Sequence, residues 1–232
     1  MSGDRITFGI KGLDEMLSGG LIPGTVASVI GQYGCGKTNF ALYFLWSGLL
    51  NGENVIHITL EERTGRIEYY MRDKGWDITP YLGKSLTIVN LDPSDFNLAI
   101  NSVKNELPEL IKRTGAHRVT IDPVSLFEDL FDDDATRRRE MMRFLDRLRD
   151  LNCTSLLTSE ADKENEFSSR YNLIEYLSDT VILLRYARGD SVSDIHLAIE
   201  VVKMRMSGHS REVKPYEILK ESMIVYTEAN VF

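Results

Sequence analysis

Residues 31–38 read Gly-Gln-Tyr-Gly-Cys-Gly-Lys-Thr, and they match the phosphate-binding pattern G-x-x-x-x-G-K-[ST] at every required position. Glycine lets consecutive backbone N–H groups turn inward around a phosphate, and a helix that starts at the end of such a loop favours an anion at its N-terminus. In this pattern Lys37 reaches the terminal phosphates and the Thr38 hydroxyl binds Mg²⁺. The alternative is a glycine-rich turn that merely connects a strand to a helix.

The residues on both sides of the loop support phosphate binding. Residues 25–31 are apolar and predict a buried strand, and residues 39–46 predict a buried helix. This strand–loop–helix arrangement is the context in which the pattern binds phosphate. We therefore expect nucleotide contacts from the loop and the first turn of the helix: Gly31, Gly34, Cys35, Gly36, Lys37, Thr38 and Asn39.

The composition is that of a soluble globular protein. The 232 residues are 43% hydrophobic and 27% charged, and the chain is long enough to bury a sizeable core. A net charge of -8 disfavours sequence-independent nucleic-acid binding, which depends on Lys and Arg contacts with phosphate. The two cysteines form no disulfide framework, the start of the chain is polar, and the apolar stretch 39–50 is too short to cross a bilayer. We expect a cytoplasmic protein with no direct membrane insertion.

Short apolar strands alternate with longer helices over the first two thirds of the chain. Strands are expected at residues 25–31, 54–60, 86–90, 117–122 and 154–158. Helices are expected at 39–46, 64–74, 97–114 and 135–151, with Asp134 as the cap of the last one. A short helix between glycine turns is expected within residues 7–24. The alternation predicts a mostly parallel central sheet flanked by helices.

The pattern changes after residue 180. Strands joined by turns are expected at 180–188, 195–206, 211–219 and 223–226, with Gly189-Asp190 and Ser207-Gly208 as turn residues. This succession predicts an antiparallel extension of the same sheet. We expect a single α/β domain that spans residues 1–232.

Polar side chains follow several of the predicted strands, at the edge where open α/β sheets bind ligands. Asp122 ends the fourth strand and suits Mg²⁺ binding together with Thr38, whereas a lone Asp at a strand end is commonly a turn residue. Glu61 and Glu62 follow the second strand, and because neighbouring strand residues point to opposite faces, only one is expected to orient an attacking water. The alternative for this pair is two solvated charges. Ser159 follows the fifth strand and joins the predicted site.

Two cations stand close together near the C-terminus. Lys203 and Arg205 lie two residues apart on a predicted strand, so they project from one face about 7 Å apart. Paired cations suit a polyphosphate partner, and the alternative is an edge strand protected by charge. His209 follows in the next turn and, taken alone, is more typical of a surface or packed histidine.

Taken together, these residues resemble the RecA-like ATPases, specifically the KaiC-like branch, which is named for the cyanobacterial clock protein and is common in archaea as single-domain members. The resemblance covers nearly the whole chain. Besides the phosphate loop, it rests on residues 9–14, Gly19-Gly20, Leu60-Glu61-Glu62, Gly75-Trp76-Asp77, Ile121-Asp122, residues 157–160, residues 178–184, Lys203-Met204-Arg205, residues 209–212 and residues 216–218.

The resemblance implies a RecA-like P-loop core that forms a ring, usually a hexamer, with ATP held between subunits. It further implies that Glu61 is the catalytic base, that Glu62 assists it, and that Lys37 acts on the phosphates. Lys203 and Arg205 are implied to reach the ATP of the neighbouring subunit, with support from His209. The clock protein's autokinase half has adjacent Ser and Thr where this chain has Glu175-Tyr176, so autokinase activity is not expected.

The leading functional expectation is a slow, Mg²⁺-dependent ATPase that acts as a regulatory or signalling switch on an unknown protein partner. A second hypothesis is a DNA-repair accessory that binds single-stranded DNA, which the acidic balance and the acidic loop after residue 158 disfavour. A third hypothesis is a nucleotide-dependent assembly module of a membrane-associated motor.

Overall fold

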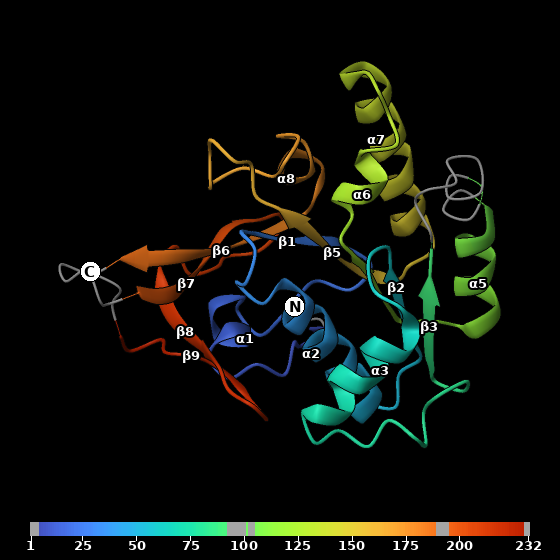
Figure 1. The fold of residues 1–232 in the computed structure, drawn as a ribbon, viewed down its shortest axis with the longest axis horizontal. Coiled ribbons are helices and arrows are strands. Elements are labelled where there is room, and N and C mark those ends of the chain that lie inside the picture. The colour runs from blue at the N-terminus through green and yellow to red at the C-terminus, as the bar shows by residue number, and fades with distance from the viewer. Residues whose placement is uncertain (1–4, 92–100, 102–104, 189–194, 230–232) are drawn as a thin grey trace.

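The computed structural model describes residues 5–91, 101, 105–188 and 195–229. Within these residues nine strands form one sheet with the spatial order β3-β2-β4-β5-β1-β6-β7-β8-β9 (Figure 1). The strands are β1 (Val26–Gly31), β2 (Val55–Thr59), β3 (Leu86–Asn90), β4 (Arg118–Asp122), β5 (Thr154–Glu160), β6 (Thr180–Arg188), β7 (Ile195–Met204), β8 (Lys214–Ile218) and β9 (Met223–Val225).

Helices cover both faces of this sheet (Figure 1). They are α1 (Leu13–Met16), α2 (Lys37–Leu50), α3 (Thr64–Asp73), α5 (Leu107–Thr114), α6 (Ser125–Glu128), α7 (Asp134–Asp150) and α8 (Ile174–Leu177). Helices α1, α2 and α3 pack on one face, and their apolar side chains form one core cluster with residues such as Ala27, Leu156 and Ile182. Helices α5, α6 and α7 pack on the other face over Val26, Ile121 and Leu157.

The parallel part of the sheet places the loop after β1 at its centre. Strand β1 is buried at all six positions and pairs in parallel with β5 on one side and β6 on the other. Parallel strands covered on both faces are typically almost entirely apolar, and the largely hydrophobic run of β1 suits this position. The carboxyl ends of β1, β2, β4 and β5 therefore meet at one edge of the sheet, and α2 starts there.

The predicted element types are confirmed for most of the chain, with two corrections. The cap of α7 is Asp133 and not Asp134, because the Asp133 carboxylate accepts a hydrogen bond of 2.8 Å from the N–H of Thr136. The antiparallel part of the sheet begins one strand later than expected, since β6 is parallel to β1 and only β7, β8 and β9 are antiparallel to their neighbours. The segment with α8 brings the chain back to the edge where β5 started, which makes the parallel pairing possible.

Two predicted features lie wholly or partly outside the described residues. The helix expected at 97–114 is confirmed for Leu107–Thr114, whereas residues 97–100 and 102–104 are outside the description, as is the Gly189-Asp190 turn. The short helices α6 and α8 were not predicted, because each has only four residues and shows no periodic pattern. No helix in the described part of the chain is long and apolar enough to span a membrane.

Candidate nucleotide-binding site

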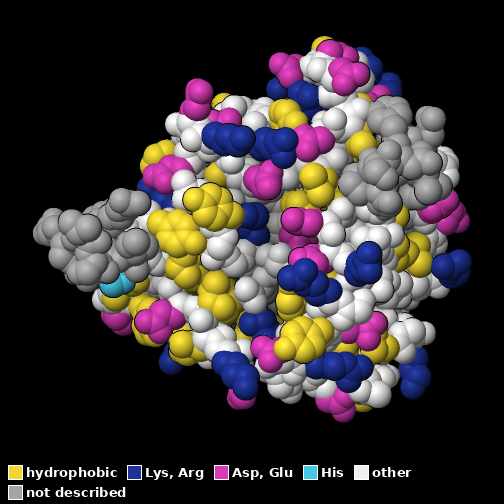
Figure 2. All heavy atoms as spheres, in the orientation of Figure 1, with side chains coloured by type: hydrophobic (Ala, Val, Ile, Leu, Met, Phe, Trp, Pro, Cys, Tyr) yellow, Lys and Arg dark blue, Asp and Glu magenta, His cyan; other side chains and the backbone are white. Residues whose placement is uncertain are grey.

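A pocket of about 510 Å³ lies at the carboxyl ends of the parallel strands, beside the loop that joins β1 to α2. In the view of Figure 2 this face is hollowed near its middle, with acidic and basic side chains at the edge of the hollow. The lining combines loop residues with strand-end carboxylates. Its members include Gly34, Gly36, Lys37, Thr38, Asn39, Thr59, Glu61, Glu62, Asp122 and Glu160. The structure thus brings together most of the residues that the sequence places in the site.

The backbone of the loop needs glycine at two positions. Gly34 and Gly36 have φ angles of 77° and 85°, a region that L-residues with a side chain rarely adopt. Space is also lacking, because a Cβ on Gly36 would lie 2.2 Å from Cδ1 of Ile218, and one on Gly34 would lie 2.5 Å from the hydroxyl of Tyr186. The two glycines therefore keep the loop backbone exposed to the pocket, where N–H groups can meet an anion.

Lys37 is the first residue of α2, and its ammonium group folds back over the loop. Nζ donates hydrogen bonds of 2.9 Å to the carbonyl of Gly31 and 3.0 Å to the carbonyl of Gln32. Burial lowers the pKa of Lys37, while the nearby Asp122 and Glu160 carboxylates act in the opposite direction. The ammonium group is therefore held at the loop by backbone carbonyls and is available to a phosphate oxygen.

Asp122 ends β4 inside the pocket and is 7% exposed. Its Oδ1 accepts a hydrogen bond from the hydroxyl of Thr158 on β5, and Thr38 lines the same pocket. The Asp122–Pro123 peptide bond is cis. An oriented carboxylate and a hydroxyl beside a phosphate loop form the donor set that Mg²⁺ uses in nucleotide sites, where phosphate oxygens and waters complete the shell.

The charge of the pocket also suits a divalent cation. Five carboxylates and two lysines line it, namely Glu61, Glu62, Asp73, Asp122 and Glu160 against Lys37 and Lys74. A polyphosphate placed among this excess of negative charge requires a compensating cation. Among the described residues, no group of three His, Cys, Asp or Glu side chains is arranged to hold a metal by itself. The residues therefore fit a metal that arrives together with a phosphate chain.

The two adjacent glutamates have different surroundings. The Glu62 carboxylate lies 3.3 Å from Nε of Arg66, and the hydroxyl of Thr59 fixes its backbone through bonds of 2.9 and 3.0 Å. The Glu61 side chain is exposed, lines the pocket and makes no hydrogen bond or ion pair with the residues that the structure describes. Of the pair, Glu61 is thus the carboxylate that is free to contact a water in the pocket.

Three predicted contact residues are not among the residues that line the pocket. The Cys35 thiol is buried, and burial raises its pKa, so the side chain is inert and only its backbone faces the loop. Gly31 is packed against β6, and a Cβ added to it would lie 2.6 Å from the carbonyl oxygen of Leu184. The Ser159 hydroxyl donates to the Glu160 carbonyl and is absent from the pocket lining.

Two residues that sequence reasoning did not single out support the site. Thr158 lies next to the predicted Ser159, and it is Thr158 that contacts Asp122. Arg170 lies in the loop after β5, and its guanidinium is 2.9 Å from Glu160 and 3.2 Å from Asp129, which ties the rim of the pocket to α6. Because side chains alternate along β5, only one of Thr158 and Ser159 can face α2. Which of the two contacts Asp122 depends on the register between β5 and β4.

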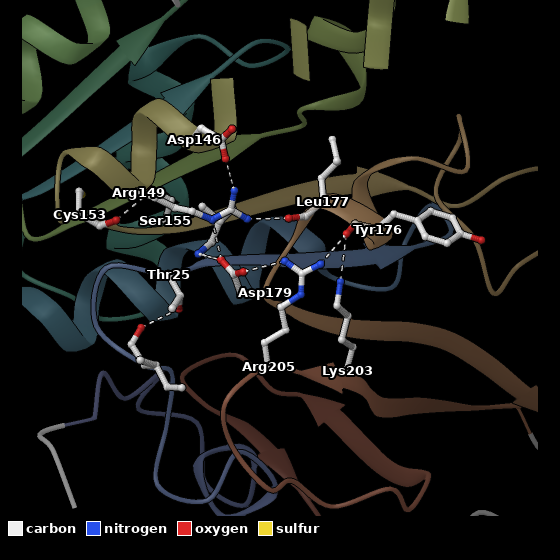
Figure 3. A network of polar contacts seen from close by, with 12 residues as sticks. Thr25, Asp146, Arg149, Cys153, Ser155, Tyr176, Leu177, Asp179, Lys203 and Arg205 are labelled. Atoms are coloured by element: carbon white, nitrogen blue, oxygen red, sulfur yellow. Dashed lines mark hydrogen bonds and ion pairs between the residues drawn. The ribbon is translucent and has the colours of Figure 1, made fainter. Parts of the chain in front are cut away.

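Lys203, Arg205 and His209 lie outside the pocket. Figure 3 shows both cations directed at the carbonyl of Tyr176, which accepts bonds of 3.2 Å from Lys203 and 3.1 Å from Arg205. Arg205 also lies 3.2 Å from the Asp179 carboxylate. The side chain of His209 is partly buried, and neither of its ring nitrogens has a hydrogen-bond partner within the described structure.

The register of the strands places the two cations far from the phosphate loop of the same chain. The N–H of Arg205 donates to the carbonyl of Asp179, and the N–H of Asp179 donates to the carbonyl of Val26. Val26 is the first residue of β1, whereas the phosphate loop follows its last residue, Gly31. Lys203 and Arg205 are therefore at the amino edge of the parallel strands, opposite the pocket.

Comparison with known proteins gives consistent matches over nearly the whole chain. The family model described as "ATPase: KaiC" matches residues 6–230. The circadian clock protein KaiC3 of Synechocystis sp. is 30% identical over 96% of this chain, which spans 45% of the length of that relative. A UPF0273 protein of Aeropyrum pernix is 30% identical, with 97% of this chain and 94% of the relative aligned. The crystal structure of a KaiC-like protein from Pyrococcus horikoshii OT3 superposes with a TM-score of 0.83 at 27% identity, and covers 96% of this chain and 99% of that one. The chain therefore belongs to the KaiC family of ATPases, as its sequence indicated.

Proposed function

We propose that this chain binds Mg²⁺-ATP in the pocket beside the phosphate loop and hydrolyses it slowly. One observation carries the proposal: a single pocket gathers the glycine loop, Lys37 and Thr38 with Glu61 and Asp122 from two other strand ends. Membership of an ATPase family agrees with this assignment. The test is a phosphate-release assay on purified protein with Mg²⁺-ATP, together with ADP binding measured by calorimetry. A folded protein that neither binds ADP nor releases phosphate from ATP contradicts the proposal.

We assign separate tasks to the loop, to Lys37 and to the two proposed metal ligands. The N–H groups of the loop and the ammonium group of Lys37 bind the phosphate chain, and Thr38 and Asp122 hold Mg²⁺. When bound, the metal supplies positive charge that offsets the charge on the phosphate oxygens. Thr158 keeps the Asp122 carboxylate in one orientation through the hydrogen bond between their side chains.

Glu61 is the residue that we assign to the attacking water. Its carboxylate lines the pocket and is not engaged with the described residues around it, whereas that of Glu62 is paired with Arg66. A free carboxylate can accept a hydrogen bond from a water and later its proton. Glu62 then has a supporting task, since its backbone bonds with Thr59 fix the turn that carries Glu61.

Lys203 and Arg205 complete the proposal through a second copy of the chain. They are held as a pair at the edge of the sheet opposite the pocket, so a contact with ATP requires the pocket of a neighbouring subunit. We propose a homo-oligomeric ring, with six subunits as the resemblance implies, in which His209 supports the two cations. In this ring, nucleotide state controls the binding of a protein partner, and the chain functions as one cytoplasmic ATPase domain.

A further inference from the structure

The phosphate loop rests on two tyrosine side chains from the C-terminal half of the sheet. Tyr216 lies on β8, and its hydroxyl donates a hydrogen bond of 2.6 Å to the carbonyl of Cys35. Tyr186 lies on β6, and its hydroxyl donates a hydrogen bond of 3.2 Å to the carbonyl of Tyr33. Both accepting carbonyls belong to the loop, and each immediately precedes one of its two glycines of positive φ.

The geometry of the peptide bond turns these contacts into a constraint on the next N–H group. A trans peptide is planar, and its C=O and N–H point in opposite directions. When Tyr216 holds the Cys35 carbonyl on the side of β8, the N–H of Gly36 must point away from β8. Gly36 lines the nucleotide pocket, so an N–H held in this direction is available to a phosphate bound there. The same relation links Tyr186 to the N–H of Gly34, which also lines the pocket.

Such a constraint is needed because glycine permits the opposite arrangement. A peptide that precedes a glycine can rotate with little steric cost, since glycine adopts positive and negative φ about equally well. A rotated peptide would present its carbonyl oxygen to an anion and would remove an N–H donor. We infer that Tyr216 and Tyr186 are positioning residues that keep the N–H groups of Gly36 and Gly34 directed at the bound phosphates. This inference rests on the proposed nucleotide binding.

Tyr216 is the stronger of the two supports. It is 2% exposed, so water does not compete for its hydrogen bond, and its ring packs edge-on against Phe40 with centroids 5.5 Å apart. Burial raises the pKa of Tyr216, which keeps the hydroxyl protonated and able to donate. The bond from Tyr186 is longer and exposed to solvent. Substitution by Phe removes each hydroxyl and retains the ring that packs in the core.

The test compares Tyr216→Phe with the unchanged protein and with a matched control, Tyr226→Phe. The Tyr226 hydroxyl donates a hydrogen bond of 2.9 Å to Glu217, which is not a loop residue, so the control removes a tyrosine hydroxyl that is not bonded to the loop. For all three proteins, Kd for ADP is measured by calorimetry, KM and kcat for ATP by phosphate release, and the nucleotide-free unfolding midpoint in urea. We expect Tyr216→Phe to raise Kd and KM about three- to tenfold, the range for loss of one hydrogen bond, with kcat within twofold.

The outcomes separate this inference from the proposed function. Equal Kd and KM in Tyr216→Phe and the unchanged protein overturn the inference and leave nucleotide binding intact. A merely structural role lowers kcat in proportion to the lost folded protein, shifts the urea midpoint, leaves KM unchanged, and also overturns the inference. Failure of the unchanged protein to bind ADP contradicts the proposed function, and the inference then fails with it. If Tyr216→Phe does not fold, the same comparison is made with Tyr186→Phe. We expect Kd and KM of that variant to rise about twofold, because the bond from Tyr186 is longer and solvated.

Discussion

The hydroxyl of Thr158 donates a hydrogen bond to Oδ1 of Asp122, and this bond joins β5 to the proposed magnesium ligand at the end of β4. Thr158 is buried and Asp122 is 7% exposed, so water competes little for this bond. A carboxylate oriented in this way presents a fixed oxygen to a metal, and loss of a partner that orients a metal ligand typically lowers metal affinity about 10- to 100-fold.

Thr158→Val should therefore weaken the binding of Mg²⁺ at the site without removing a metal ligand. We expect the magnesium concentration for half-maximal ATP hydrolysis to rise about tenfold. Ser155→Ala on the same strand is the control, because among the described residues the Ser155 hydroxyl is hydrogen-bonded to the Cys153 carbonyl alone, at 3.4 Å. An unchanged magnesium requirement in Thr158→Val would remove Asp122 from the metal site or show that its orientation does not matter.

Lys37→Ala should abolish nucleotide binding and phosphate release. The substitution removes the only ammonium group that is bonded to the loop carbonyls within the described part of the chain. A loss of binding greater than about a hundredfold is expected from losing a charge-assisted contact with phosphate. Calorimetry with ADP and a phosphate-release assay measure the two effects. Retained turnover would show that the active site lies elsewhere.

Glu61→Gln should keep ATP binding and lose turnover. The amide has the same size as the carboxylate but cannot accept the proton of water, so kcat is expected to fall about 10²- to 10⁴-fold with Kd little changed. Glu62→Gln provides the comparison. Because Glu62 is paired with Arg66, we expect kcat of this variant to fall less than tenfold. A larger loss in Glu62→Gln than in Glu61→Gln would exchange the two roles.

Arg205→Ala should slow hydrolysis in protein that still binds ATP. Arg205 lies at the edge of the sheet opposite the pocket of its own subunit, so we expect its effect to pass through a neighbouring copy. Mixed rings of Arg205→Ala and Glu61→Gln subunits are expected to recover turnover, because some interfaces combine an intact Glu61 with an intact Arg205. No recovery in rings whose mixed composition is verified by mass measurement would argue against action between subunits.

Glu128 provides a pH-dependent prediction about stability. It is fully buried in α6, and burial, reinforced by the nearby Glu175 carboxylate, raises the pKa of Glu128 from 4.5 to about 8. A raised pKa means that the folded protein binds a proton more tightly than the unfolded chain, so stability falls as pH rises from about 4.5 to 8. Glu128→Gln removes this penalty. Compared with the unchanged protein, the variant should have an unfolding free energy that is higher by about 1 kcal/mol at pH 5 and by about 3 kcal/mol at pH 7. Urea unfolding at both pH values measures it, and a gain that does not change with pH contradicts a protonated Glu128.

The fold followed from the sequence because its signals are local. The apolar run of β1, the glycine loop and the buried face of α2 are contiguous, and strands 54–60, 86–90 and 117–122 differ from β2, β3 and β4 by at most one residue at either end. The parallel pairing of β6 with β1 was missed because turn residues show where strands end but not which strands become neighbours.

The parts of the site that escaped prediction depend on contacts distant in the chain. Tyr216 is 181 residues from its partner Cys35, and Tyr186 is 153 residues from Tyr33. The choice of Thr158 over Ser159 depends on the register between β4 and β5. No periodic pattern near these residues indicates such partners, and the roles of Glu61, Lys203, Arg205 and His209 stay predictions.

In the proposed complex, a nucleotide phosphate chain lies against the loop between Gly34 and Thr38, with Mg²⁺ close to Asp122. The most direct test is a crystal structure of this chain with Mg²⁺ and a slowly hydrolysed ATP analogue. We expect phosphate density within hydrogen-bond distance of the Gly36 N–H and the Lys37 ammonium group. An analogue bound at another place, with this pocket free of density, would contradict it.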